Sequence, residues 1–260
     1  MAQHAQAYAY PVLGDLPVDA IDTGLVLRVL EPIWSTKPET AGRVRGRIES
    51  VLSWAKVADC RAGDNPARWR GHFDQPLPAR RKVRRVRHHA ALPYREMPAF
   101  VTELRVQPGM AARALELTIL CATRTSETLD ARWTEIDGNL WTIPPERMKG
   151  GRAHRVPLSS AALDLLASLP QECEYLFPGA RQQKSLSNMA MTMVLRRMGR
   201  GNVTVHGMRS AFRDWAAEVA HAPREVAEAA LAHAVGDEVE AAYQRADLLE
   251  RRRGLMEAWT

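Results

Sequence analysis

Apolar residues in the first part of the chain recur at the spacing of a helix. Between residues 37 and 58 they follow one another every three or four positions, at Val44, Ile48, Val51, Leu52 and Ala55. That repeat places them on one face of an α-helix, and Pro38 suits the first helical turn. We expect a helix over residues 37–58 that buries this face in a core.

The pattern changes further along the chain. Residues 98–107 and 108–120 predict two helices, the second apolar along one side. Strand-like stretches at 140–144 and 154–158 flank Gly150 and Gly151, which predicts an antiparallel hairpin with Lys149 at its tip. After Leu158 the pattern indicates helices separated by short breaks. The expected fold class is mainly α with a small antiparallel β-sheet.

A basic, proline-rich segment marks the best domain boundary. Four prolines between residues 76 and 98 surround six basic side chains: Arg80, Arg81, Lys82, Arg84, Arg85 and Arg87. We expect a helical domain at residues 1–88, a linker at 89–97 and a larger domain at 98–260. The basic residues either cross a DNA backbone, where each neutralised phosphate releases counterions, or belong to a solvated linker.

Charge is distributed unevenly between these parts. The formal net charge is +6 and the pI is near 9.5; residues 1–90 hold 15 Lys and Arg against 9 Asp and Glu, and the remainder holds 21 of each. A basic first third fits a polyanionic partner such as DNA. There Arg43, Arg45 and Arg47 fall off the apolar stripe, and their helix face either contacts phosphates or is solvated. Residues 91–260 have no net charge, so any arginines that bind an anion there must lie close together in one site.

Composition excludes several classes of protein. No apolar run of roughly 18 residues is present to span a bilayer, and no signal peptide is visible, so a cytoplasmic, nucleoid-associated protein is expected. Cys60, Cys121 and Cys173 lie far apart without metal-ligand spacing, which indicates reduced thiols. The sequence has no glycine-rich phosphate loop and no tight acidic cluster, so any phosphodiester chemistry is expected to need neither metal nor cofactor.

Cleaving a phosphodiester without a metal needs a nucleophile, cations around the non-bridging oxygens and an acid for the leaving oxygen. His206 and Arg209 are three apart at the start of a predicted helix and project from one side of its first turn. Arg124 follows an apolar helix, and Glu127 is placed to hold it in one orientation. Each pattern alone is common at protein surfaces, and a lone tyrosine such as Tyr243 is usually a packing residue.

The order and spacing of these pieces resemble the tyrosine recombinases, and most closely the phage-type integrases. The matching stretches are ATRTSETLDARWTEID, WTIPPERMKGGRAHRVPLS, VHGMRSAFRDWAAE and EVAEAALAHAVGDEVEAAYQRADLLERRRGLMEAW, within residues 95–260. Upstream, YAYPVLGDLPVDAI and ETAGRVRGRIESVLSWA resemble the family's core-binding domain. The resemblance implies a helical core-binding domain at 1–88, an α+β catalytic domain at 98–260, and no N-terminal arm-binding domain.

The resemblance also implies a role for each candidate residue. Arg124 and Arg209 correspond to the two arginines that grip the scissile phosphate, with Glu127 in support. Two guanidinium forks suit this task because they meet a trigonal-bipyramidal phosphorus in two planes.

The remaining roles concern proton transfer and attack. By resemblance, Lys149 protonates the leaving 5′ oxygen, His206 assists proton transfer from the tyrosine and His233 hydrogen-bonds the phosphate. Tyr243 attacks phosphorus and leaves a 3′-phosphotyrosine and a free 5′-hydroxyl. This ester conserves the energy of the broken bond, so a second strand can attack it without ATP.

The implied function is integration or excision of a mobile element, with double-stranded attachment-site DNA as partner. A monomer is expected in free solution, a tetramer on DNA, and accessory DNA-bending proteins are further possible partners. Two alternatives stay open: a DNA-binding regulatory module without catalysis, and a type IB topoisomerase-like enzyme. Two positions for the last helix also stay open, on its own domain or on a neighbouring protomer.

Overall fold

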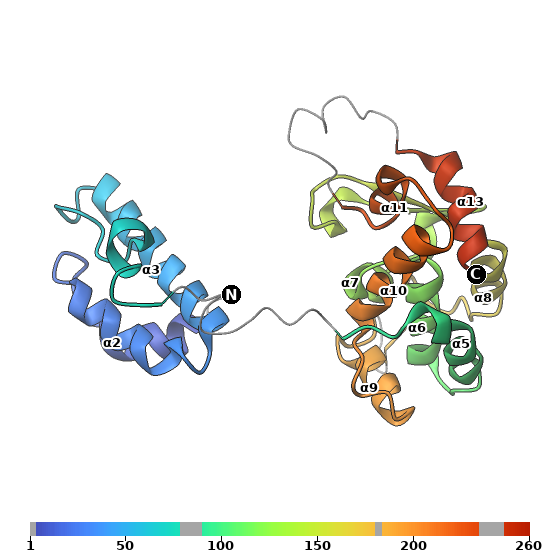
Figure 1. The fold of residues 1–260 in the computed structure, drawn as a ribbon, viewed down its shortest axis with the longest axis horizontal. Coiled ribbons are helices and arrows are strands. Elements are labelled where there is room, and N and C mark those ends of the chain that lie inside the picture. The colour runs from blue at the N-terminus through green and yellow to red at the C-terminus, as the bar shows by residue number, and fades with distance from the viewer. Residues whose placement is uncertain (1–3, 79–89, 180–183, 234–246) are drawn as a thin grey trace. The chain divides into compact units, whose positions relative to one another are not determined.

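The computed structural model describes residues 4–78, 90–179, 184–233 and 247–260. The chain forms two compact units, Met1–Arg87 and His88–Thr260 (Figure 1). No helix within the described ranges is long and apolar enough to cross a membrane.

The first unit is helical. Its elements are η1 (Ala5–Ala9), α1 (Tyr10–Leu13), α2 (Thr23–Trp34), α3 (Pro38–Val57) and η2 (Trp69–Phe73). The predicted helix over 37–58 is confirmed as α3, which packs against α2. Ile48 and Leu52 are buried as expected, but Val51 is 56% exposed because it lies at the border of the stripe.

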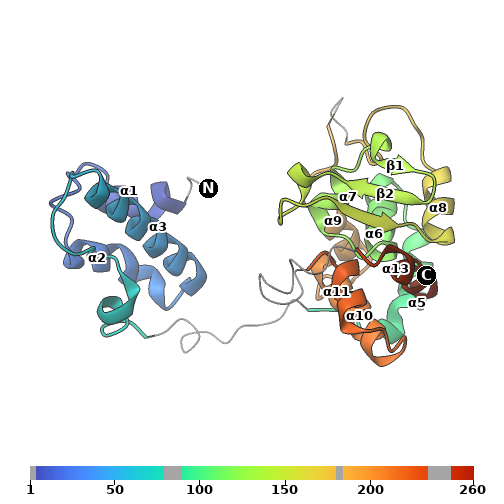
Figure 2. The same ribbon diagram turned by 90° about the horizontal axis from the view of Figure 1, so that it is seen from above.

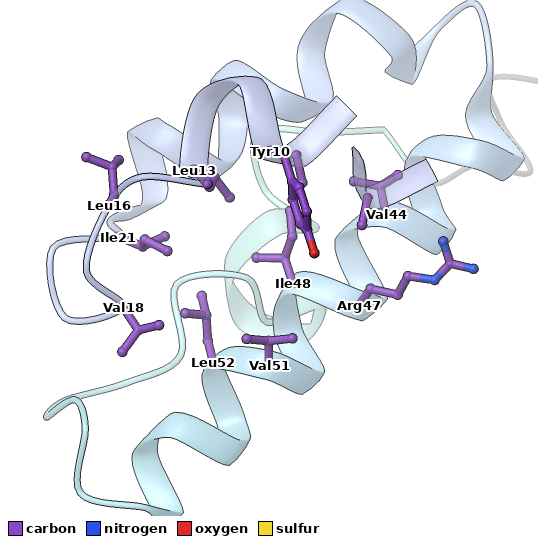
Figure 3. Close-up of a pocket in the computed structure, with 13 residues that line it drawn as sticks. Tyr10, Leu13, Leu16, Val18, Ile21, Val44, Arg47, Ile48, Val51 and Leu52 are labelled. Carbon is purple, nitrogen blue, oxygen red and sulfur yellow. The ribbon is translucent and has the colours of Figure 1, made fainter. Parts of the chain in front are cut away.

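An apolar cavity of about 410 Å³ lies between α1 and α3 in this unit (Figure 3). Its walls include Leu13 of α1 together with Ile48 and Leu52 of α3. Tyr10 and Val51 stand at its mouth, where both side chains are more than half exposed. The first unit therefore presents apolar side chains to solvent on this face.

The second unit combines helices with one small sheet. Its helices are η3 (Tyr94–Glu96), α5 (Met97–Arg105), α6 (Met110–Leu120), α7 (Thr125–Leu129), η4 (Trp133–Glu135), η5 (Pro145–Arg147), α8 (Ser160–Ala167), α9 (Ala190–Arg197), α10 (Val205–Glu218), α11 (Arg224–Ala230) and α13 (Leu249–Trp259). Its strands are β1 (Ile136–Asp137), β2 (Leu140–Ile143) and β3 (His154–Pro157). The expected fold class is confirmed.

The three strands form an antiparallel sheet in the order β1-β2-β3. The predicted hairpin is present as β2 and β3, in which Trp141 lies opposite Val156 and both side chains are buried. Helix α6 packs against α5, α7, α8, α9 and α10 and is buried from Ala114 to Leu120. It lies in the middle of the unit, with the sheet on one side and α10 on the other (Figure 2). Strand β1 was not predicted, because two residues carry no periodic signal.

In this structure the last helix, α13, packs on its own unit. The Trp259 ring meets that of Phe212 edge-on and lies tilted against that of Trp215, both on α10, and its indole N–H donates to the carbonyl of Ile119 at 2.9 Å. Glu257 accepts from the backbone N–H of Ser160 at 3.0 Å, at the start of α8. These contacts hold α13 against α6, α8 and α10.

Candidate active site

Arg124 is held at the junction of two helices. It is the N-terminal cap of α7, and Glu127 accepts both its backbone N–H at 2.7 Å and its Nη1 at 2.6 Å. The Glu127 side chain is 2% exposed, so this ion pair lies in a place where water screens it little. The pairing expected from their spacing is present, and it fixes the guanidinium of Arg124 in one orientation.

Arg209 projects inward from the first turn of α10. Thr204 begins that helix by accepting from the backbone N–H of Gly207 at 3.0 Å. The Arg209 side chain is 3% exposed and donates from Nη1 to the carbonyl of Ala122 and from Nη2 to that of Leu231 at 2.5 Å. Buried arginines need such partners because an unpaired buried charge is strongly destabilising.

The turn that follows α11 brings the two arginines together. Arg124 Nη2 donates to the carbonyl of Ala232 at 3.1 Å and lies 3.5 Å from that of Leu231, the oxygen that also accepts from Arg209. The next residue, His233, places Nε2 3.2 Å from Nη2 of Arg209. Three of the predicted residues, Arg124, Arg209 and His233, therefore meet around one turn, and we name them the arginine cluster.

Two alanines in left-handed conformation shape this cluster. Ala122 and Ala232 both have φ of 49°, a region in which a residue with a Cβ is strained by roughly 1–2 kcal/mol. Each one supplies a carbonyl that accepts from an arginine, Ala122 from Arg209 and Ala232 from Arg124. The strain is offset because these turns satisfy buried guanidinium groups.

Within the described part of the chain, Arg209 is the member of the cluster that has no carboxylate partner. Burial lowers the pKa of Arg209 to about 10, and the like charge of Arg124 adds to the effect, against the attraction of Glu127 and Glu228. Arg209 therefore remains charged at neutral pH. Two neighbouring guanidinium groups that disfavour each other gain from a shared anion, and planar forks match the geometry of phosphate oxygens.

Sequence reasoning missed a histidine beside the cluster. His154 of β3 is 7% exposed and its ring donates to the carbonyl of Ala230. Burial, together with the charges of Arg252, Arg209 and Arg124, lowers its pKa to about 3, so the ring is neutral. The signal available in the sequence was a polar residue at an inward position of a strand, in the stretch His154–Pro157.

A second missed feature anchors the chain just after residue 246. Arg155 of β3 donates to Asp247 through Nε at 2.6 Å and Nη2 at 2.9 Å, and these bonds lower the pKa of Asp247. Arg252 of α13, 2% exposed, donates to the carbonyls of both Asp247 and Arg155. Asp247 and the start of α13 are thereby fixed to the sheet.

The structure places the other predicted residues as follows. Lys149 is exposed in the turn between β2 and β3, and His206 is exposed in the first turn of α10. Within the described ranges, no hydrogen bond or ion pair joins Lys149 to the arginine cluster. Tyr243 lies outside the described residues, ten positions after His233 in the sequence.

The basic residues of the first unit differ in their surroundings. Arg43 is exposed on α3, and Arg47 lies beside the apolar cavity. Arg45 is engaged within its own unit, where it donates to Glu49 at 2.7 Å and to the carbonyl of Ala67 at 2.6 Å. The predicted basic linker residues, Arg80, Arg81, Lys82, Arg84, Arg85 and Arg87, lie outside the described residues.

A close backbone approach holds the turn that carries Arg209. The carbonyl of Ala90 accepts from the backbone N–H of Thr204 at 3.0 Å, and a Cβ added at Gly207 would clash with that carbonyl and lie 2.8 Å from Cα of Ala91. We therefore expect Gly207→Ala to destabilise the second unit by about 1–3 kcal/mol, the usual cost of overpacking. Thermal unfolding measures this loss. Gly201→Ala is the control, because its Cβ would meet only Arg196 at 3.7 Å, and an equal midpoint for both variants would refute the clash.

Residues 92–249 match the phage integrase family, and residues 1–72 match the phage integrase central domain. The chain belongs to the phage integrase family. The arginine cluster of this integrase-family chain lies within the matched range, and so does Tyr243.

Individual relatives agree with this membership. The chain is 31% identical to prophage integrase IntA of Escherichia coli (strain K12) over 96% of its length, and 29% identical to the integrase of Enterobacteria phage P4 over 99%. It spans 61% and 62% of the lengths of these two relatives. Its fold matches that of a lambda integrase tetramer bound to a Holliday junction, with a TM-score of 0.67 at 16% identity, over 91% of this chain and 71% of that one.

Proposed function

We propose that this chain is a site-specific DNA recombinase that cuts and rejoins strands through a 3′-phosphotyrosine at Tyr243. The observation that carries the proposal is the arginine cluster, in which Arg124, Arg209 and His233 meet on the turn after α11. Tyr243 follows that turn by ten residues. Membership of the phage integrase family supports the same assignment.

The chemistry follows from these positions. Arg124 and Arg209 hold the scissile phosphate and stabilise charge that develops on its oxygens; losing one such contact typically costs about 3–4 kcal/mol in the transition state. His233 hydrogen-bonds a phosphate oxygen. Tyr243 attacks phosphorus, and the 5′ oxygen departs.

Two further residues move protons in this proposal. His206 assists removal of the proton from the Tyr243 hydroxyl, and Lys149 donates a proton to the leaving 5′ oxygen. Lys149 reaches the DNA from an exposed turn, where a long side chain has room to move. The 5′-hydroxyl of a second strand then attacks the phosphotyrosine and restores the tyrosine, so the exchange consumes neither ATP nor a metal ion.

The proposed substrate is double-stranded attachment-site DNA of a mobile element, in integration or excision. The two units bind it together, with Arg43 and the basic linker contributing phosphate contacts. Assembly into a tetramer on DNA is proposed because the similar lambda integrase structure is a tetramer bound to a Holliday junction. The free protein is proposed to be a monomer, and accessory DNA-bending proteins to assist the assembly.

Covalent capture tests the proposed function. The protein is incubated with a nicked duplex taken from the junction beside its own gene, so that the cut strand end diffuses away and the phosphotyrosine accumulates. A protein–DNA adduct stable in denaturant is expected with the wild type and none with Tyr243→Phe. Site-specific binding without an adduct would identify a regulatory module instead, and relaxation of an unrelated supercoiled plasmid would identify a topoisomerase.

A further inference from the structure

Glu228 occupies a position that the proposed chemistry leaves unexplained. It lies on α11 with 7% of its surface exposed, and both carboxylate oxygens have partners. Oε2 lies 2.6 Å from Nδ1 of His233, and Oε1 accepts from Nη2 of Arg213 at 2.7 Å. The backbone N–H of His233 also donates to the carbonyl of Glu228 at 2.9 Å, so the turn itself brings the two side chains together.

The partners of His233 determine which of its nitrogens carries the proton. A guanidinium has five donors and no acceptor, so Arg209 donates to Nε2 of His233, and Nε2 must present its lone pair. The proton of the neutral ring therefore sits on Nδ1, where an ionised carboxylate 2.6 Å away accepts it. Burial opposes ionisation of Glu228, but the His233 hydrogen bond and the Arg213 charge outweigh it and lower its pKa.

We propose that Glu228 is a positioning residue, which fixes His233 as the Nδ1–H tautomer with Nε2 turned toward the arginine cluster. Arg213, on the exposed side of α10, fixes Glu228 in turn. A carboxylate that holds the far nitrogen of a functional histidine sets both the tautomer and the ring orientation. This tautomer describes the protein without DNA. To donate to a phosphate oxygen, Nε2 must take up a proton, and the ionised Glu228 beside Nδ1 then stabilises the imidazolium. The catalytic part of this inference rests on the proposed function; the tautomer does not.

The first consequence concerns orientation. Without Glu228 the ring of His233, whose side chain is 40% exposed, has no acceptor for Nδ1–H within the described part of the chain and is free to rotate about its χ angles. Arg209 then loses an acceptor that aligns Nη2. We expect Glu228→Ala to lower the single-turnover cleavage rate about 10- to 100-fold at saturating protein, the range typical when a residue that orients a metal-bound histidine is removed.

Nitrogen-15 NMR of histidine-labelled protein in the absence of DNA tests the tautomer directly. The couplings between ring nitrogens and ring carbon-bound protons distinguish Nδ1–H from Nε2–H, and His233→Gln assigns the signal. We expect Nδ1–H in the wild type and its loss in Glu228→Ala. Glu228→Gln, whose amide oxygen still accepts from Nδ1, is expected to keep Nδ1–H and to restore part of the cleavage rate.

Glu225→Ala is the matched control, because Glu225 lies on the same helix and pairs at 3.4 Å with exposed Arg251, outside the cluster. It should change neither the tautomer nor the rate. An Nε2–H tautomer in the wild type overturns the inference, as does Glu228→Ala with unchanged tautomer and rate. If Glu228→Ala does not fold, the wild type and Glu228→Gln decide. If the wild type forms no adduct, the proposed function fails, and the tautomer is still judged by NMR.

Discussion

Replacing Arg209 with lysine is expected to lower the rate of DNA cleavage about 10²- to 10³-fold, the usual effect of removing one donor to developing charge. Lysine keeps the positive charge but loses the planar fork. In this structure the two Nη atoms of Arg209 reach carbonyls on separate segments, Ala122 after α6 and Leu231 after α11. A single ammonium cannot hold both and also meet a phosphate, so the cluster loses its alignment.

The measurement is single-turnover adduct formation on the nicked duplex, together with thermal unfolding. Arg113→Lys is the matched control: Arg113 also donates to carbonyls, those of Leu104 and Arg105, and pairs with Glu116, but shares no partner with Arg209. Both variants should lose stability, and only Arg209→Lys should lose cleavage. A folded Arg209→Lys protein that cleaves within tenfold of the wild type would remove Arg209 from the phosphate site.

Local pattern predicted the parts of this fold that depend on local forces. The three- and four-residue spacing of apolar positions located α3, and the glycine pair between two strand-like stretches located the β2–β3 hairpin. The ion pair between Arg124 and Glu127 also follows from spacing, since residues three apart on a helix are neighbours. In these cases the partners lie on one helix, at one helix end, or on the two strands of a single hairpin.

Partners distant in sequence were not predictable from the same patterns. Arg45 appeared to be part of a basic surface, but the carbonyl of Ala67, 22 residues away, accepts its hydrogen bond. Glu228 lies among small apolar residues of α11, and its link to Arg213 exists because α10 packs beside that helix. Such contacts depend on how helices pack, which the periodicity of a single segment does not contain.

The resemblance to a known family assigned roles to residues that the physical chemistry of each residue alone left undecided. Residue by residue, His206, Arg209 and Tyr243 each had a common surface or packing explanation, and nothing local distinguished a site from a solvated helix. The structure adds that Arg124, Arg209 and His233 share one turn. It also adds supporting side chains, His154 and Glu228, which neither the spacing nor the resemblance had identified.

Lowering the pH from 7 to 5 is expected to destabilise the second unit by about 2 kcal/mol through His154 alone. Its pKa is about 3 in the folded protein against an ordinary value of 6.5, because the ring is buried and faces three arginines. Between these values the unfolded chain binds a proton that the folded chain does not. The stabilisation is therefore complete above pH 6.5 and is lost progressively as the pH falls toward 3.

Denaturant unfolding at several pH values measures this slope. His154→Gln keeps a donor for the carbonyl of Ala230 but cannot take up a proton, so its stability should change about 2 kcal/mol less than that of the wild type between pH 7 and 5. His221→Asn is the control, because His221 is exposed and has φ of 46°, a conformation that asparagine tolerates. It should keep the slope of the wild type.

The carboxylates with lowered pKa, Glu228 and Asp247, act in the same direction but only at more acidic pH, since their stabilisation is lost below the ordinary carboxylate range. Equal slopes for the wild type and His154→Gln would mean that the buried ring accepts a proton in the folded state, and that the field of the arginine cluster is weaker than its geometry implies.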